Sequence, residues 1–406
     1  MEMEKRREGF MIRKMFPILI LLLAAQGGAF GQDVKTYEAS SSHYQVVSEI
    51  SAAHAAELGR YLDSLYDYFA SLFHFEAQRA ATGLRVRILA NKERYDGHLK
   101  SLIDQTREDF IYLHYGNPGK RELVGYATDE ENFRVSLNHQ AFVQIFRSFV
   151  SNPPLWIREG FAVYFEKISV DPGSHRAVYS ENLAWLDTLK DLAAGQGDRL
   201  LPLETVLSLT NEGARDNIEV FYPQAWGLVS FLMNSPKKEH NRLLWDAVAA
   251  LQPEASLEDN IRRVYDRSFK WYDQDSLCED FFVYLEGRRS FRSLLREGMD
   301  AYTAGRLDEA ERALTAAGEM EKDNFMPPYY RGLIEYARKN YSSAEELYKI
   351  ALEKGAQPSL IYYALGINAY ADRKPEEAVS YLKIAAEIDP EYREKAEELM
   401  GRMGGR

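Results

Sequence analysis

The run His139-Gln140-Ala141-Phe142-Val143 is the segment whose residue types and spacing come closest to those of a metal site. Zinc hydrolases place two imidazoles four residues apart on one helix face, with a glutamate between them that takes a proton from zinc-bound water. Here the first histidine is present, but Gln140 stands in the base position and Val143 in the second ligand position. An amide cannot accept that proton, which by itself removes about 10²–10⁴ in rate, and valine cannot bind metal.

The sequence from 138 to 166 resembles the gluzincin metallopeptidases, in particular the peptidase-MA-like group. In that family one helix carries HExxH, and a Trp-x-x-Glu-Gly motif on the next helix supplies a third ligand. Trp156-Ile157-Arg158-Glu159-Gly160 matches the second motif. The resemblance covers residues 35–290 and implies that His139 and Glu159 occupy ligand positions. It also implies that Tyr222, within the segment FYPQAW, can face the site and steady an oxyanion.

Two interpretations of this motif stay open. In the first, His139 is a buried polar residue hydrogen-bonded to Glu159, and the region is a degenerate, non-catalytic peptidase. In the second, a side chain outside the motif, such as His114 or His175, completes a zinc site, and the protein is an active metallopeptidase. Two ligands are one short of a catalytic zinc site, which favours the first interpretation. We therefore expect no catalytic residue and no cofactor, with zinc as the alternative.

Hydrophobic periodicity predicts the elements that must position these residues. Alternation predicts a strand at 84–90. Short strands are also expected at 44–49, and at 110–115 and 123–127 on either side of the turn signal Asn117-Pro118-Gly119. Apolar residues at helical spacing predict a helix at 52–73, one that starts near Ser136, and one at 155–166 after Asn152-Pro153-Pro154. From there to 289 the pattern is helical. Together these elements predict an α+β fold with a small mixed sheet, which the resemblance makes gluzincin-like.

The C-terminal quarter of the chain repeats itself every 34 residues. Four sets of residues keep this spacing, namely Gly298/Gly332/Gly366, Tyr302/Tyr336/Tyr370, Ala310/Ala344/Ala378 and Ala317/Ala351/Ala385. This period with small residues at fixed places is typical of tetratricopeptide (TPR) repeats. We therefore predict an all-α TPR solenoid of three repeats at 291–390, followed at 391–406 by a solvating cap helix and tail.

Aromatic residues are expected along the inner groove of this array. On a tetratricopeptide frame, the groove positions include Tyr302, Tyr329, Tyr336, Tyr363 and Tyr370. The Lys and Asn positions by which some such arrays hold a peptide carboxylate are missing. One interpretation is a groove for an apolar peptide or partner helix, and the other is that these residues only pack the repeats together.

Composition and the N-terminus limit the class of protein. The 406 residues carry a net charge of −12, which argues against nucleic acid as the main partner. A basic segment, the apolar run Phe16–Ala25 and small residues up to Gly31 predict a cleaved export signal at 1–31. The apolar run is short of the roughly 20 residues that span a membrane. Cys278 is the only cysteine, so no intrachain disulfide forms, and we expect a periplasmic or secreted protein.

These observations combine into one functional hypothesis. The expected domains are the signal at 1–31, a peptidase-MA-like domain at 32–290, three TPR repeats at 291–390, and the cap at 391–406. We expect an exported pseudoenzyme that binds a protein or peptide through its TPR groove, without nucleic acid and without stable membrane insertion. The alternative is an active zinc metallopeptidase that uses His139 and Glu159.

Overall fold

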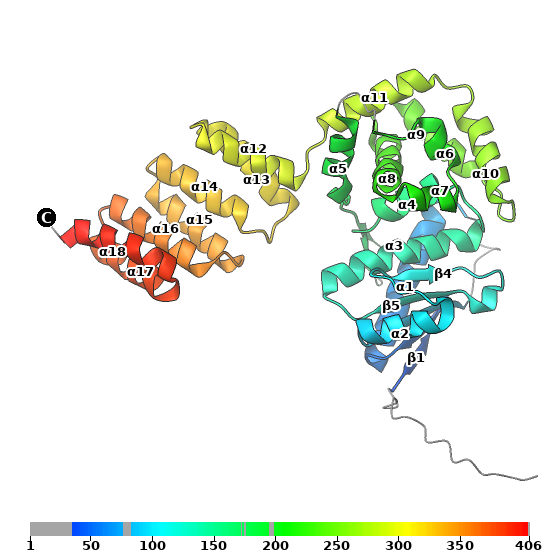
Figure 1. Cartoon of the computed structure of the whole chain (residues 1–406), viewed down its shortest axis with the longest axis horizontal. Helices are drawn as coiled ribbons and strands as arrows, with labels where there is room; N and C mark the ends of the chain where they lie inside the picture. The colour runs from blue at the N-terminus through cyan, green and yellow to red at the C-terminus, as the bar shows by residue number, and fades with distance from the viewer. Residues whose placement is uncertain (1–34, 76–82, 172, 174–175, 195–198, 405–406) are drawn as a thin grey trace, which may run out of the picture.

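The computed structural model describes residues 35–75, 83–171, 173, 176–194 and 199–404. The expected export signal at 1–31 and His175 lie outside these described residues. A mixed sheet with surrounding helices comes first, and a row of helix pairs then runs to the C-terminus (Figure 1). Within the described ranges, none of the helices combines the length and the apolar character needed to cross a membrane.

Five strands in the described part of the chain form one mixed sheet in the order β1-β2-β3-β5-β4. They are β1 (Tyr37–Ser40), β2 (Tyr44–Ser48), β3 (Leu84–Leu89), β4 (Ile111–Leu113) and β5 (Glu122–Tyr126). Strands β2, β3 and β5 run parallel, while β1 and β4 pair antiparallel at the two edges. The small mixed sheet is confirmed. The sequence pattern missed β1, whose alternation of apolar and polar residues extends over only four residues, all of them at least partly exposed.

Each face of the sheet packs against helices. Helices α1 (Ala52–Leu72) and α3 (Glu130–Phe149) cover one face, where Leu123 joins the main core. Helix α2 (Lys92–Ile103) covers the other face, where the next residue, Val124, joins a separate cluster. Successive strand residues point to opposite faces. Both faces of β5 are therefore buried, whereas β2 and β3 alternate, with Gln45, Arg85 and Arg87 less buried than their neighbours.

Helix α3 begins at Glu130, earlier than the start near Ser136 that the apolar pattern predicts. The Asp129 side chain accepts the N–H of Asn132 and so caps the helix, and acidic residues in the first turn suit the positive end of the helix dipole. This polar first turn carries no hydrophobic pattern. After Asn152-Pro153-Pro154 the next helix, α4 (Leu155–Tyr164), begins as predicted.

Helices make up most of the next segment, with one short hairpin that the sequence pattern did not predict. Strands β6 (Ser169–Val170) and β7 (Ala177–Val178) form it. The helices are α5 (Ala184–Ala193), α6 (Leu203–Ser208), α7 (Asn211–Asp216), α8 (Ile218–Asn234), α9 (Lys238–Ala249), α10 (Leu257–Val264), the π turn η3 (Tyr265–Phe269) and α11 (Gln274–Gly287). Together with α1, α3 and α4 they bury one continuous hydrophobic core.

A close crossing of α4 and α8 explains the glycine of the Trp-x-x-Glu-Gly motif. A Cβ on Gly160 would lie 2.4 Å from the Ala225 carbonyl oxygen and 2.6 Å from a methyl carbon of Val229. These distances are below van der Waals contact, so only glycine permits this approach. Because Glu159 precedes Gly160, the crossing also fixes the position of Glu159 along α8, the helix that carries Tyr222.

The C-terminal region is a TPR-like array of antiparallel helix pairs. The pairs are α12/α13 (Phe291–Thr303, Leu307–Met320), α14/α15 (Met326–Ala337, Tyr341–Glu353) and α16/α17 (Pro358–Ala371, Pro375–Ile388). A Cβ on Gly298, Gly332 or Gly366 would come within 2.7 Å of the paired helix, at Leu314, Tyr348 and Leu382 respectively. Helix α18 (Pro390–Gly404) packs on α17 through the buried Ala396.

Replacing Gly160 with alanine tests the α4–α8 crossing. We expect Gly160→Ala to lower the free energy of unfolding by about 1–3 kcal/mol, because the extra methyl group overpacks a rigid backbone contact. The matched control is Gly97→Ala in α2, where a Cβ would meet nothing within 4 Å. That change should stabilise by up to about 1 kcal/mol. Urea unfolding of both variants measures the difference, and equal midpoints would contradict the close crossing.

Candidate functional site

Helix α3 carries the three positions of the metal motif, His139, Gln140 and Val143, and the last two make structural contacts. The Gln140 side-chain oxygen accepts the backbone N–H of Tyr112 on β4, at 3.0 Å. Val143 is 7% exposed and belongs to the main core. Gln140 therefore ties α3 to the edge strand, and Val143 fills space between the helix and its neighbours. Neither side chain is placed for hydrolysis.

His139 lies between two carboxylates that come from the following helix and the turn after it. Its Nδ1 is 2.8 Å from a Glu166 oxygen, and its Nε2 is 3.4 Å from a Glu159 oxygen. Asn182 donates its side-chain amide to the other Glu166 oxygen. Both ring nitrogens therefore face acceptors, an arrangement that suits the doubly protonated, positively charged imidazole.

The protonation states follow from this enclosure. Burial opposes the charge on His139, but hydrogen bonds with Glu159 and Glu166 outweigh it and raise its pKa to about 10. Burial likewise opposes ionisation of Glu159, yet the charge of Arg158 and the bond with His139 lower its pKa to about 2. The Arg158 Nε donates to Glu159 at 2.6 Å. The result is a buried, charged network that joins α3 to α4.

Tyr222 is brought to the same network from α8. The charge of Glu159 and then burial raise its pKa to about 12. The structure therefore brings Tyr222 near Glu159, which contacts His139. It adds Glu166, which the sequence reasoning missed. A signal was present in the sequence, since Glu166 follows Glu159 by seven residues, which on the predicted helix at 155–166 would put both carboxylates on one face; in the structure Glu166 lies in the turn after α4.

The described donor atoms do not fit a catalytic zinc centre. Both nitrogens of His139 are occupied by carboxylates, and the position one turn later holds Val143. Across the part of the chain that the structure describes, no group of three or more His, Cys, Asp or Glu side chains is arranged to hold a metal ion. Of the side chains proposed to complete a site, His175 lies outside that part. His114 faces Tyr112, with its Nδ1 3.4 Å from the hydroxyl oxygen.

A basic cluster lies next to the carboxylates and was also missed. Burial, followed by the charges of Arg147, Arg121 and Arg158, lowers the pKa of His114 to about 3. Burial and the charge of Arg158 lower the pKa of Arg147 to about 10. Arg121 comes from just before β5, Arg147 from α3 and Arg158 from α4. Because they are scattered in sequence, no spacing rule reveals this cluster.

The five tyrosines expected in the groove differ in their contacts. Tyr302, Tyr329, Tyr336 and Tyr363 are partly buried, whereas Tyr370 is 37% exposed. Rings from successive helix pairs meet, with centroids 6.4 Å apart for Tyr302 and Tyr330. Tyr363 likewise meets Tyr392 of α18, at 5.3 Å. Tyr302 and Tyr363 therefore pack neighbouring helices of the array together, whereas Tyr329 and Tyr336 meet Tyr348 and Tyr341 of their own helix pair.

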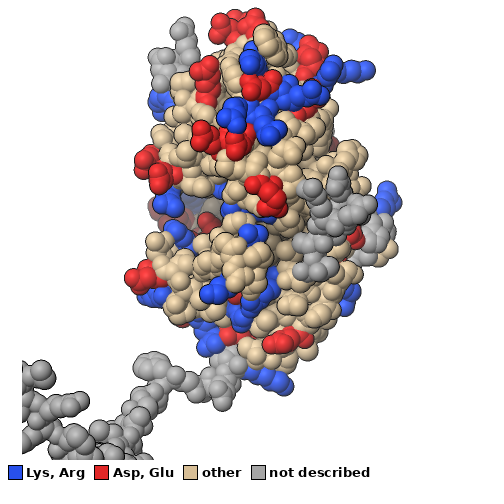
Figure 2. Space-filling model, turned by 90° about the vertical axis from the view of Figure 1, so that its right-hand side faces the viewer, with Lys and Arg blue, Asp and Glu red and all other residues tan. Residues whose placement is uncertain are grey.

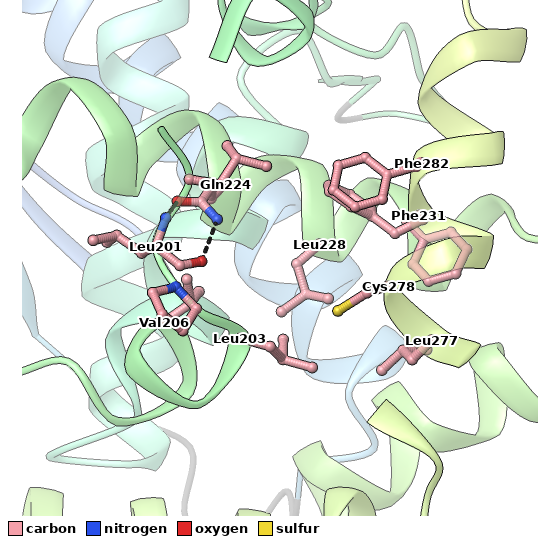
Figure 3. Close-up of a pocket in the computed structure, with 12 residues that line it drawn as sticks. Leu201, Leu203, Val206, Gln224, Leu228, Phe231, Leu277, Cys278 and Phe282 are labelled. Carbon is pink, nitrogen blue, oxygen red and sulfur yellow. Dashed lines mark hydrogen bonds between the residues drawn. The ribbon is translucent and has the colours of Figure 1, made fainter. Parts of the chain in front are cut away.

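An apolar pocket of about 290 Å³ lies between α6, α8 and α11 (Figure 3). Gln224 is the polar amide in its wall, and it is satisfied by Leu201, whose N–H it accepts at 2.8 Å and whose carbonyl it donates to at 3.0 Å. Cys278 lines the opposite side, where burial raises the pKa of its thiol. A thiol without a basic partner is a poor nucleophile, so this pocket offers hydrophobic contact and little chemistry.

Charged groups are mixed in sign on the face of the molecule that Figure 2 draws. On the face in Figure 2, Lys and Arg side chains alternate with Asp and Glu and with uncharged residues. Such a surface lacks the concentrated positive potential that phosphate backbones require.

Comparison with known proteins gives similarity to tetratricopeptide domains. No protein-family model matches this chain, and no curated protein does. Three solved structures are similar to part of it: the Arabidopsis OM64 TPR domain (16% identity, 28% of this chain and 95% of that chain, TM-score 0.26), the first TPR of Spaghetti (RPAP3) bound to the HSP90 peptide SRMEEVD (20%, 28% and 94%, 0.26), and the N-terminal domain of stress-induced protein-1 from C. elegans (19%, 27% and 93%, 0.24). The TPR-like fold of the C-terminal region rests on its own helix pairs and 34-residue period.

The opposite shifts of His139 and His114 can be measured by an NMR titration of their ring signals. We expect His139 to stay protonated to above about pH 8, with a pKa of about 10, because two carboxylates hold its charge. His114 should stay neutral at mildly acidic pH, with a pKa of about 3. His139→Gln and His114→Gln assign the signals. Two normal titrations near pH 6.5 would contradict the described network.

The same shift predicts a pH dependence of stability. The folded-state pKa of His139 is raised above its unfolded value of about 6.5. Its contribution is therefore fully present below about pH 6.5 and is lost as the pH rises toward 10. Accordingly, the difference in melting temperature between the wild type and His139→Gln should shrink from neutral to alkaline pH. A constant difference would mean that His139 is not charged in the folded protein.

Proposed function

We propose that the protein is an exported, non-catalytic member of the gluzincin-like peptidases whose C-terminal array binds a protein or peptide partner. The observation that carries the first half is the enclosure of His139 by Glu159 and Glu166. A metal ligand needs a nitrogen lone pair directed at the metal, and here each nitrogen is directed at a carboxylate. Gln140 in the base position is engaged by the backbone of β4.

The N-terminal part would then serve as a folded scaffold. Its charged network joins α3, α4 and Tyr222, so the former catalytic positions act as internal ties. Helix packing at Gly160 holds the same framework. Export is proposed from the basic and apolar sequence at 1–31, which suits a chain whose single cysteine forms no disulfide.

The array supplies the interaction surface in this proposal. Its inner positions are tyrosines and aliphatic residues, which offer large rigid contact areas with a hydroxyl at the edge. The Spaghetti domain named above was solved with a bound peptide, and a peptide or partner helix is the class of ligand that we propose here. Recognition would rest on apolar burial, because the lysine and asparagine positions that hold a peptide carboxylate in some arrays are replaced.

A second candidate function is that of an active zinc metallopeptidase. The observation in its favour is that His139, a residue of metal-ligand type, contacts two carboxylates, Glu159 and Glu166. For zinc to bind, His139 would have to exchange one carboxylate for the metal. The two proposals differ in metal content and in cleavage, and both can be measured.

Zinc analysis of the chain from residue 32 onward decides between them. We expect no stoichiometric zinc in the wild type, and the same content in His139→Ala, because no nitrogen lone pair is available. Casein should stay uncleaved, with or without a chelator. One zinc per chain that is lost in His139→Ala, together with chelator-sensitive cleavage, would establish the peptidase and overturn the first half of the proposal.

The groove is tested by affinity capture with the full exported chain. We expect a saturable protein or peptide partner whose binding weakens by roughly tenfold or more in a Tyr336→Ala/Tyr370→Ala variant, as is usual for aromatic anchors of an interface. Trp271→Ala is the control, since this ring is 84% exposed and lies outside the array. A partner that binds both variants alike would show that the tyrosines only pack the repeats.

A further inference from the structure

The apolar pocket between α6, α8 and α11 reaches from the surface into the main hydrophobic core (Figure 3). Its floor is made of four buried core residues, Val206, Leu228, Phe231 and Leu277. Its rim is made of side chains that stay partly exposed, Leu203, Cys278, Phe281 and Phe282. A ligand that covers this apolar surface gains free energy in proportion to the area that it removes from water.

The polar side-chain atoms in the wall of the pocket are engaged or weak. Gln224 uses both atoms of its amide on the backbone of Leu201. The other polar side-chain atom among the described lining residues is the sulfur of Cys278, which is a weak donor and a weak acceptor. None of these described residues carries a charge. A polar group that entered would lose its water without gaining a good hydrogen bond, so the pocket favours hydrocarbon.

The size of the pocket limits the length of that hydrocarbon. Its volume of about 290 Å³ is close to the lower limit of about 300 Å³ for small-molecule pockets. An apolar cavity of about 150 Å³ is enough to bind benzene. By proportion to the carbon atoms of benzene, this pocket holds a chain of about ten to twelve carbons.

We propose that the pocket binds the alkyl chain of an amphiphile of about ten to twelve carbons, with the polar head left in water at the rim. A side chain of another protein fits less well, because its backbone N–H and C=O groups would press against Leu203, Phe281 and Phe282, whose side chains offer no hydrogen bond. Fatty acids and uncharged lipids both supply such a chain. The proposal goes beyond the proposed function, since the described lining contains neither His139 nor a residue of the helical array.

Calorimetric titration with alkanoates of increasing length, from hexanoate to tetradecanoate, tests the pocket in the chain from residue 32 onward. We expect the association constant to rise about fourfold for each added methylene group. The rise should stop at about ten to twelve carbons, because the rest of a longer chain stays in water. An affinity that does not depend on chain length, or that rises through tetradecanoate without a limit, would overturn the proposal.

The source of the chain is distinguished by comparing decanoate with decanol. Similar affinities would show that the chain alone is recognised. Binding of decanoate alone would assign the pocket to fatty acids, and binding of decanol alone would assign it to uncharged lipids. Absence of saturable binding for both would overturn the proposal.

Cys278 reports whether the ligand occupies this pocket. It is the only cysteine of the chain, and Figure 3 shows its sulfur directed from α11 toward Leu228. At ten times its dissociation constant, decanoate should slow the reaction of this thiol with a chromogenic disulfide reagent about tenfold, because about one pocket in ten is then free. The control is Cys278→Ser/Val283→Cys, since Val283 is on the same helix but 68% exposed and outside the pocket lining. Equal protection of both thiols, or of neither, would contradict the location.

Variants of the wall separate a ligand pocket from a packing defect. Cys278→Phe should weaken decanoate binding by roughly tenfold or more, because the ring takes the place of two or more buried methylene groups. Without ligand it should melt at the same or a higher temperature, as cavity-filling changes do. Leu203→Gln places an amide at the rim and should also weaken binding. Val283→Phe is the control and should bind as the wild type does.

Two results would contradict the assignment. In the first, Cys278→Phe folds and binds decanoate with the affinity of the wild type. In the second, Cys278→Phe does not fold, and Leu203→Gln binds as tightly as the wild type. Because these measurements involve neither zinc nor the helical array, the pocket can fail while the proposed function stands.

Discussion

The buried pairing of His139 with Glu159 and Glu166 is the interaction on which the arrangement of the N-terminal part depends. It connects α3 to α4 and to the turn after α4, and Asn182 extends it to the segment before α5. A network of this kind is satisfied only when every member is present, since removal of one partner leaves a buried charge. This requirement accounts for the packing around it: Gly160 brings α4 against α8, and Gln140 holds α3 against β4.

The two regions of the chain achieve stability in different ways. The N-terminal region buries one continuous core in which segments far apart in sequence meet, with Phe73, just after α1, in contact with aromatic rings of α3, α4 and α9. The array buries smaller clusters between neighbouring helices, as repeat proteins do.

The turn inside each helix pair of the array has a residue in the left-handed backbone conformation. Gly305, Lys339 and Arg373, each 34 residues apart, share a positive φ of 74°, 67° and 62°. The repeat geometry demands a left-handed residue there, and only the first turn supplies glycine.

The sequence was most informative where a physical rule links neighbouring residues. Alternation located β3, a turn signal separated β4 from β5, and the spacing of Gly298, Gly332 and Gly366 located the helix pairs, because each glycine faces the paired helix at the same point of the repeat. The sequence was least informative where a polar side chain, and not a hydrophobic pattern, determines where an element begins, or where an element is short. The first turn of α3 is set by the Asp129 cap, and β1 is a short edge strand. The first turn of α3 leaves no periodic hydrophobic signal, and the alternation of β1 extends over only four residues.

For the candidate site, the sequence by itself determined which groups are missing: an amide at Gln140 and an aliphatic side chain at Val143 exclude the usual base and second ligand whatever the fold. The tertiary structure alone decided the charge of the histidines. His139 and His114 have the same side chain, yet carboxylates surround one and arginines the other, so their pKa values move in opposite directions, to about 10 and about 3. Protonation depends on the field at the imidazole. That field is produced by residues from β4 to α4 that only folding brings together.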